Sequence, residues 1–529
     1  MNRESGLERS LKKHPYLIFT IVFLFCSVFT FGLILFVKGD SLILGGDAAG
    51  QHYPSLIYYS SWLRELFRNI FVEHNFSIPQ WDLSIGYGRD VLTTIHYYVL
   101  GDPLTLFCVF FPPEKIEYFY DFLVVFRLYL AGLACTAFLR TRKFSGTGVL
   151  LAAIVYVFSG YAMNPGIFHP FFSIPMIYFP LLLIGVEKMY QKKSPWVLVF
   201  SVFLSAVSNL YFFYMECIFV ILYACLRYFS YFPVFRVKEC LAWILRFVAF
   251  ALLGCMLASP IILPNLFTIL FSERMSVERE LLSWYPQSYY RMMPASLIAN
   301  FSSYYFYVAV AAVAVVLLMI LLSAPLRKYL VEKCLFLVFI CIAAVPLLGS
   351  AMNGFTYATN RWIWAFILFL SWCCARIYPE LRRISGRHLL RAVILCVLFC
   401  IACVVPRSCR EAKTFAALGI LLLILLLVIL YHRVKRFPSA VFAYGMVAVT
   451  VLNIIVNTAV LYRPFDAEAS SGFLPSGNAY ASVRPDVLNT IAELPDTELS
   501  RFETEALNQG NNSAMLYGLN GVDYLLQCD

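Results

Sequence analysis

The chain has 529 residues, of which 61% are hydrophobic and 14% are charged, and its mean hydropathy is +0.75. Soluble domains are about 45–50% apolar and about 25% charged, so the composition excludes a soluble, disordered or disulfide-stapled protein. The net charge of +10 comes from short basic clusters between long apolar blocks, which argues for membrane topology signals and against nucleic acid as a partner. These features predict an all-α polytopic membrane protein.

The sixteen cysteines do not change this prediction. Most of them lie inside apolar runs, as Cys373 does, and a buried free cysteine behaves as a small hydrophobic residue. No CxxC pair occurs with a second pair or a histidine at metal-ligand spacing. Cys108, Cys409 and Cys528 are expected outside the membrane, and the sequence gives them no pairing.

The predicted spans begin close to the N-terminus. Residues 1–15 are basic and precede an apolar run over 16–38, which is too long for a signal peptide and lacks a small-residue cleavage site. Residues 16–462 are therefore predicted to form a membrane domain of about thirteen helices, each needing roughly 20 residues to cross the bilayer. The later runs start near 117, 146, 171, 196, 211, 240, 306, 334, 361, 389, 414 and 438.

Basic residues set the expected orientation, because cytoplasmic loops are enriched in lysine and arginine. The clusters lie at 140–143, 188–193, 227–238, 327–333, 376–391 and 433–436. They place residues 1–15 in the cytoplasm, and an odd number of spans then places the C-terminus outside. The run from 196 to 229 is predicted to be a hairpin that turns near Asn209, since both of its ends are basic.

Three segments are expected outside the membrane: a first loop over 39–116, a second over 264–305, and the tail 463–529. The tail is acidic and has no clear hydrophobic periodicity, so we expect the start of a domain that is truncated or completed by a partner. Ionisable residues expected at membrane depth are few, namely Asp121, Arg127, Glu216 and Arg246. Since such residues usually mark transport paths, their scarcity favours chemistry at the outer surface.

The first loop opens with a glycine-flanked acid, in the segment from Gly45 to Pro54. A carboxylate there can accept a proton from an attacking hydroxyl group, and the small neighbours leave room for a bulky ligand. Taken alone, the motif favours another interpretation, in which Asp47 caps the helix that follows. Residues 53–71 repeat apolar side chains at helical spacing and predict an amphipathic helix in the membrane interface. Asp102, before a proline, is typical of a turn.

Three motifs in this order carry a family resemblance: GGDAAGQHYP at 45–54, WDLSIGYGRDVL at 81–92, and YYVLGDPLTLF at 97–107. Together with shorter matches at 159–161, 208–211 and 359–362, the chain resembles the YfhO family of bacterial membrane proteins over roughly 15–465. That family lies within the GT-C class of polytopic glycosyltransferases. The resemblance implies a GT-C-like fold, usually continued by a longer extracytoplasmic domain and a last span.

The resemblance also implies an activity and a site. A sugar would pass from a polyprenyl-phosphate donor to a cell-envelope polymer, such as a teichoic or lipoteichoic acid, at the outer leaflet. Asp47 matches the catalytic acid, and Asp102 is implied as a second acid or as a residue that orients the loop. Groups expected to bind the substrate are Arg89, His96, His169, Asn209, Arg274, Arg279 and Arg361.

Arg361 begins a helix at the predicted outer interface, where its planar guanidinium suits a phosphate. The alternative, which we weigh equally, is an interfacial anchor beside Trp362 and Trp364. His14, His388 and His432 are predicted to be solvated surface residues. Acids near a phosphate suit a divalent metal, but no DxD or HExxH spacing in the first loop assigns one.

Two other functions stay open. Runs interrupted by proline at 175–180 and 260–264 are compatible with a flippase or exporter of a lipid-linked envelope precursor. A non-catalytic assembly protein, whose tail recruits a partner, is the third hypothesis. A lipid-sized groove leading to Asp47 would favour the transferase, and a closed bundle with a central polar cavity would favour the exporter.

Overall fold

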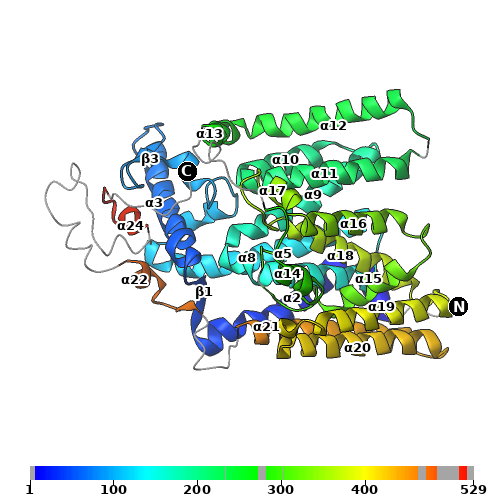
Figure 1. Cartoon of the computed structure of the whole chain (residues 1–529). Coiled ribbons are helices and arrows are strands. Elements are labelled where there is room, and N and C mark those ends of the chain that lie inside the picture. The colour runs from blue at the N-terminus through cyan, green and yellow to red at the C-terminus, as the bar shows by residue number, and fades with distance from the viewer. Residues whose placement is uncertain are drawn as a thin grey trace.

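The structure is a helical bundle with a smaller assembly of short elements at one end (Figure 1). The computed structural model describes residues 6–232, 234–271, 282–301, 303–462, 472–484 and 512–520. The N-terminus lies at one end of the bundle, which we call the N-terminal end. The other end, which we call the loop end, carries α3 (Tyr53–Phe71), β1 (Asp40–Leu44) and the described parts of the tail.

Nine helical segments in the described part of the chain are long and apolar enough to cross a membrane. They are built on α2 (Pro15–Thr30), α5 (Ile116–Thr141), α9 (Ile174–Tyr190), α11 (Leu210–Tyr231), α12 (Val237–Leu257), α18 (Ile363–Ile377), α19 (Gly386–Val404), α20 (Ala412–Arg433) and α21 (Ser439–Tyr462). The remaining predicted runs contain shorter helices: α6 (Thr147–Val157), α10 (Trp196–Ser208), α15 (Ala312–Ser323) and α16 (Leu330–Ala344). Every predicted run therefore holds a helix, while the count of thirteen crossings stays a prediction.

The core and the periphery of the bundle differ in burial but little in composition. Every residue of α6 is buried, and so is every residue of α15 except Leu322. In α12 only Gly254 is buried, although this helix is also strongly apolar. A helix that is apolar on all sides is stable either inside a protein or against lipid. We therefore assign α6 and α15 to the core, and α12 to the lipid-facing periphery.

Shorter elements connect these helices. They are α1 (Gly6–Lys13), α4 (Val91–Ile95), α7 (Gly160–Met163), α8 (Pro165–Phe168), α13 (Ser259–Leu270), α14 (Gln287–Ser296), α17 (Pro346–Ala351), α22 (Ala479–Val483) and α24 (Ser513–Tyr517), with strands β2 (Trp81–Asp82), β3 (Arg89–Asp90) and β4 (Phe473–Pro475). The strands form two antiparallel pairs, β1 with β4 and β2 with β3. Arg274 and Arg279 lie outside the described residues.

Two local predictions are confirmed. Helix α3 has the predicted bounds and lies crosswise to the bundle helices (Figure 1). The predicted hairpin is also present, because α10 ends at Ser208 and the side chain of Asn209 caps α11. One detail of α3 is corrected: residues 53–60 are buried on all sides, so its first half belongs to the core instead of lying on the surface.

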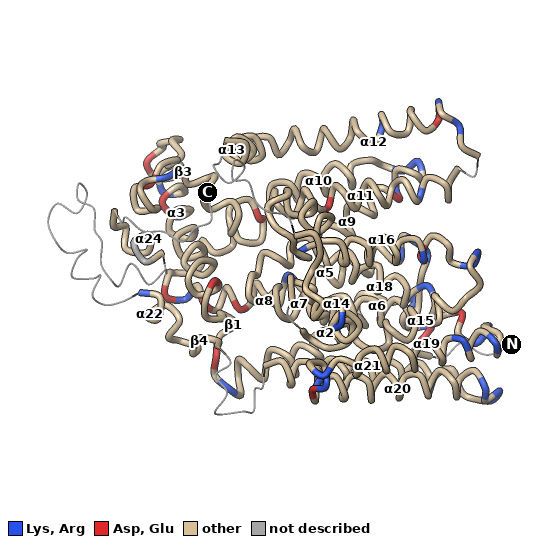
Figure 2. Tube along the Cα trace, in the orientation of Figure 1, with Lys and Arg blue, Asp and Glu red and all other residues tan. Residues whose placement is uncertain are grey.

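Charged residues are unevenly placed along the bundle. Figure 2 shows lysine and arginine gathered at the N-terminal end, which the positive-inside rule predicts to be cytoplasmic. His388 lies toward this end, but it is buried, and its ring bonds to the carbonyl oxygen of Ile320 at 2.8 Å. The prediction of a solvated His388 was therefore wrong: an apolar helix face covers this histidine and a backbone carbonyl satisfies its ring nitrogen.

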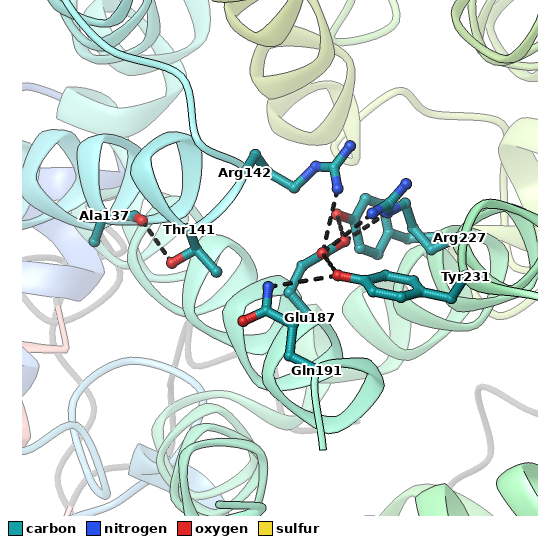
Figure 3. Close-up of polar contacts among 8 residues, drawn as sticks. Ala137, Thr141, Arg142, Glu187, Gln191, Arg227 and Tyr231 are labelled. Atoms are coloured by element: carbon teal, nitrogen blue, oxygen red, sulfur yellow. Dashed lines mark hydrogen bonds and ion pairs between the residues drawn. The ribbon is translucent and has the colours of Figure 1, made fainter. Parts of the chain in front are cut away.

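A single buried carboxylate, that of Glu187 on α9, ties three helices together (Figure 3). It accepts hydrogen bonds from Arg227 at 2.6 Å and from Tyr231 at 2.8 Å, both on α11, and from Arg142 just after α5 at 3.2 Å. Tyr223 of α11 donates a further bond at 2.5 Å. We call these five residues the Glu187 clamp. Two residues of the predicted cytoplasmic basic clusters, Arg142 and Arg227, are thus part of the packing.

The tail folds back onto the first loop instead of starting a separate domain in the part that is described. Strand β4 pairs with β1, so that Leu44 lies opposite Phe473. The carboxylate of Glu117, at the start of α5, accepts hydrogen bonds from the backbone N–H groups of Gly477 and Ala479 at 2.6 and 3.0 Å. Residues 463–471, 485–511 and 521–529 lie outside the described residues.

Candidate functional site

Asp47 stands in a turn between β1 and α3. Gly46 has a φ of +78°, a conformation that glycine adopts without strain, and residues 48–52 then form one wide helical turn that leads into α3. The Asp47 side chain is 44% exposed, and its Oδ1 accepts a hydrogen bond of 2.9 Å from the Gln51 side-chain amide. It makes no capping bond to a backbone N–H group, so the structure does not support the helix-cap interpretation.

Two histidines lie behind this carboxylate. Nε2 of His169 is 3.9 Å from Oδ2 of Asp47, and Nδ1 of His169 is 2.7 Å from Nε2 of His52. Both rings are buried. Burial lowers the pKa of His52 to about 3, and burial together with the neighbouring His52 ring and the charge of Arg361 holds the pKa of His169 well below its ordinary value. The two imidazoles are therefore neutral at physiological pH, and the N–H group of one of them donates to the ring nitrogen of the other.

Arg361 lies just before α18, inside a ring of aromatic side chains. Its guanidinium carbon is 4.8 Å from the ring centre of Tyr305, 5.6 Å from Phe172 and 5.7 Å from Tyr357. Tyr211 is a fourth neighbour, at 5.9 Å. Each of these rings is within the range of a cation–π contact, which is about 6 Å. No carboxylate forms an ion pair with Arg361 in the part of the chain that the structure describes.

Arg361 and Asp47 belong to one electrostatic unit. Burial raises the pKa of the Asp47 carboxyl above its ordinary value, and the positive charge of Arg361 offsets part of this rise. Phe172 links the two groups, because its ring stacks on His169 with centroids 4.7 Å apart and also faces Arg361. An accessible carboxylate therefore lies within electrostatic reach of a cation that aromatic rings surround.

Asp102 has a different environment from Asp47. Its side chain is buried, and Oδ2 forms an ion pair of 2.5 Å with Arg127 of α5. Oδ1 accepts a hydrogen bond from the N–H group of Leu104 at 2.9 Å. Both oxygens are therefore engaged within the protein. This geometry favours the second of the two implied roles, in which Asp102 orients the loop.

Two more of the predicted ligands also hold the loop. The buried ring of His96 bonds to the Val207 carbonyl at 2.9 Å, and burial lowers its pKa to about 4. Asn209 donates to the carbonyl of Tyr97 at 2.9 Å and accepts from the N–H group of Phe212. These contacts join the end of the first loop to the turn between α10 and α11. Arg89 lies in β3, opposite Asp82 of β2.

The likeness to known proteins extends over nearly the whole chain. The model of a family described as bacterial membrane protein YfhO matches residues 17–524. The chain belongs to the YfhO family. It is also similar to the crystal structure of ArnT from Cupriavidus metallidurans bound to undecaprenyl phosphate, with 13% identity and a TM-score of 0.46, over 95% of this chain and 85% of that one. No curated protein matches the sequence.

Sequence reasoning missed two residues at the site of this YfhO-family protein. Gln51 bridges Asp47 to Tyr98, whose hydroxyl group donates to the Gln51 amide oxygen at 2.9 Å. His52 supports His169 from the opposite side. The spacing could have pointed to Gln51, because residues i and i+4 meet on one face of a helical turn. No local signal pairs His52 with His169, since 117 positions separate them.

In the described residues, no three His, Cys, Asp or Glu side chains are grouped so that they could share a metal ion.

Proposed function

We propose that this protein is a glycosyltransferase that moves a sugar from a polyprenyl-phosphate donor to an acceptor hydroxyl at the outer face of the membrane. The acceptor is a cell-envelope polymer, such as a teichoic or lipoteichoic acid. The observation that carries the proposal is that Asp47, half-exposed and free of a cap bond, feels the charge of Arg361, which forms no ion pair with a carboxylate among the described residues. The motifs that resemble GT-C enzymes support the choice of donor.

In the proposed reaction the two groups have separate tasks. Asp47 accepts the proton of the acceptor hydroxyl as its oxygen attacks the anomeric carbon of the sugar. The bond between that carbon and the phosphate oxygen breaks, and polyprenyl phosphate leaves with the bonding electrons. Arg361 stabilises the charge that develops on the phosphate, and a desolvated cation does so more effectively than one in water. His169, whose ring is buried behind Asp47, is the titratable group next to the Asp47 carboxylate on the side of the protein interior.

The ionisable residues expected at membrane depth do not support the exporter hypothesis. Asp121 accepts the backbone N–H group of Leu42 in β1 at 2.6 Å, and Arg127 is paired with Asp102. Both therefore hold the first loop in place. Arg246 is exposed on α12. Of the four ionisable residues expected at membrane depth, Glu216 is therefore the one that is buried between bundle helices, where it bonds to Ser205. A continuous polar path would need more such groups.

The test uses purified protein in liposomes that contain a polyprenyl phosphate carrying a radiolabelled sugar. We expect label on an added envelope polymer and, in equal amount, free polyprenyl phosphate. An exporter would leave the sugar–phosphate bond intact and change only the leaflet in which the labelled lipid lies. Movement of intact donor without release of polyprenyl phosphate would therefore contradict the proposal.

A further inference from the structure

The turn that carries Asp47 is bonded at both ends to the tail. Before Asp47, the N–H group of Gly45 donates to the carbonyl oxygen of Gly472 at 2.6 Å. After it, the carbonyl oxygen of Gly50 accepts a hydrogen bond of 2.8 Å from the side-chain amide of Asn512. Asn512 is only 6% exposed, and 462 positions along the chain separate it from Gly50. Both tail segments therefore contact the backbone of this one turn.

The tail segments are themselves firmly attached to the first loop. The hydroxyl group of Ser41 donates to the carbonyl of Leu474 at 3.0 Å, and the N–H group of Ser476 donates to the carbonyl of Gly39 at 2.9 Å. Glu117 holds the chain just beyond, through its bonds to Gly477 and Ala479. The first segment is thus fixed along its length by β1 and by α5.

Arg484 joins the two tail segments to each other. Its guanidinium lies over Tyr480 of the first segment, 5.5 Å from the ring centre, and over Tyr517 of the second, at 4.3 Å. The second segment, which includes α24, also contacts α3 directly. The segment that carries Asn512 is therefore held in place by Arg484 and by α3, independently of the bond between Asn512 and Gly50.

The turn needs such support because its own sequence provides little. Gly45, Gly46 and Gly50 have no side chains that could fix the backbone, and glycine loses the most conformational freedom when it is ordered. A general base must also be held accurately, since a displacement of 1 Å can cost about 10²-fold in rate. The bonds at Gly45 and Gly50 bracket Asp47 and limit that displacement.

We propose that residues 472–484 and 512–520 form part of the active centre, with Asn512 as a positioning residue for Asp47. This inference rests on the proposed role of Asp47 as the base. The tail is then not a recruitment arm or an independent domain in these segments. It completes the site from a distance of more than four hundred positions along the chain.

The decisive variant is Asn512→Asp. Aspartate has the same shape and tolerates the φ of +48° at this position, but its ionised side chain has no N–H group to donate to Gly50. We expect kcat for sugar transfer to fall about tenfold to a hundredfold. The KM for the polyprenyl-phosphate donor should be unchanged, because the variant leaves Arg361 intact. The matched control is Asn75→Asp, an exposed asparagine of the first loop outside the proposed site, which should behave as the wild type.

The outcomes separate this proposal from the proposed function. If Asp47→Asn is inactive while Asn512→Asp keeps wild-type kcat, the positioning proposal is overturned and the base assignment stands. If Asp47→Asn is itself active, the proposed role of Asp47 as the base is contradicted, and the positioning proposal that rests on it is contradicted with it. A loss of kcat in Asn512→Asp with an unchanged melting temperature supports positioning. An equal loss in Asn75→Asp would show a non-specific effect of an added negative charge and would also overturn the proposal.

A second experiment tests whether the tail stays in place during turnover. Leu44 and Phe473 are opposite each other in the β1–β4 pair, so Leu44→Cys with Phe473→Cys can be oxidised to pin the tail to the loop. We expect the pinned protein to keep its kcat, with each single-cysteine variant as the control for the native cysteines. Loss of activity on oxidation that is restored by reduction would mean that the tail must leave the site, and would overturn a fixed positioning role.

Discussion

The Glu187 clamp and the Asp47 site both contain a carboxylate, arginine and aromatic rings, but the groups are satisfied to very different degrees. The Glu187 side chain is fully buried, and Arg142, Tyr223, Arg227 and Tyr231 donate to its oxygens. Asp47 is 44% exposed and accepts one hydrogen bond, from the Gln51 amide. The first arrangement is closed, and the second leaves lone pairs facing the solvent.

This difference separates a packing role from a chemical one. A carboxylate whose oxygens are all engaged cannot accept a proton from a substrate without losing bonds that hold helices together. Three polar atoms near Asp47, namely Nδ1 of His52, Nε2 of His169 and Nε of Arg361, have no hydrogen-bond partner among the described residues, and Nε of Arg142 at the clamp has none either. The two sites therefore differ in the exposure of the carboxylate and in the number of donors that it accepts from, and not in the presence of unsatisfied atoms.

The largest expected effect comes from Asp47→Asn, which keeps the shape of the side chain and removes the proton acceptor. Loss of a positioned base costs about 10²–10⁴-fold in rate, and we expect sugar transfer in liposomes to fall by that factor. The amount of folded protein should be unchanged, because the side chain supports no helix.

The matched control for this variant is Asp90→Asn. Asp90 caps α4 by accepting the N–H group of Thr93 at 2.7 Å, and asparagine caps about as well as aspartate. Asp90→Asn should therefore be nearly silent. Near-normal transfer by Asp47→Asn would place Asp47 in the same class as Asp90 and remove it from the mechanism.

The second effect is on stability. Glu187→Gln leaves Arg142 and Arg227 without their counter-charge at a mostly buried position, and breaking such a pair costs about 3 kcal/mol or more. We expect a lower melting temperature in detergent, with kcat per folded molecule unchanged. The control is Glu239→Gln, whose ion pair with Arg236 is exposed and is expected to contribute little. If Glu187→Gln instead lowered kcat and left the melting temperature unchanged, the clamp would influence catalysis at the Asp47 site and would not act on stability alone.

Much of the fold could be predicted because membrane helices obey local rules. Each predicted apolar run contains a helix of the bundle. The basic clusters lie together at one end of the bundle, and residues 53–71 form the predicted helix. The hairpin at Asn209 followed from charge alone. Periodicity could not show that residues 53–60 are buried, since an apolar stripe looks alike against lipid and against protein.

The site was predictable where a residue lay in a motif of the family or was a basic group expected at the outer surface. Asp47, His169 and Arg361 were expected, and they lie together. His96, Asn209 and Asp102 were also expected as site residues, and their side chains hold the loop, because a polar residue near a ligand and one that caps a turn have the same sequence signal. The contacts of Asn512 and His52 connect distant segments, which a single sequence does not reveal.

The third effect concerns donor binding. Arg361→Lys keeps a positive charge but loses the planar, bidentate group and its stacking on Tyr305 and Phe172. We expect a rise of about tenfold in the KM for the polyprenyl-phosphate donor, with a smaller change in kcat. Arg410→Lys is the control, since Arg410 is exposed and bonds to the Val404 carbonyl. A KM equal to that of the wild type would return Arg361 to the role of an interfacial anchor.

The smallest effect, and the sharpest test of the coupling within the site, is on the pH profile. Asp47 must be deprotonated to accept a proton, so kcat/KM falls as the pH drops below the pKa of its carboxyl group. Burial raises that pKa, and the charge of Arg361 holds it down. Arg361→Gln removes the charge, so the pKa rises further and the acid limb moves to higher pH, by about one unit or less. Glu187→Gln, at the other end of the bundle, should leave the limb in place. If the acid limb stays fixed in Arg361→Gln, the charge of Arg361 does not influence the pKa of Asp47. The Asp47 site would then differ from the Glu187 clamp in exposure alone, and not as a pair of groups that act together.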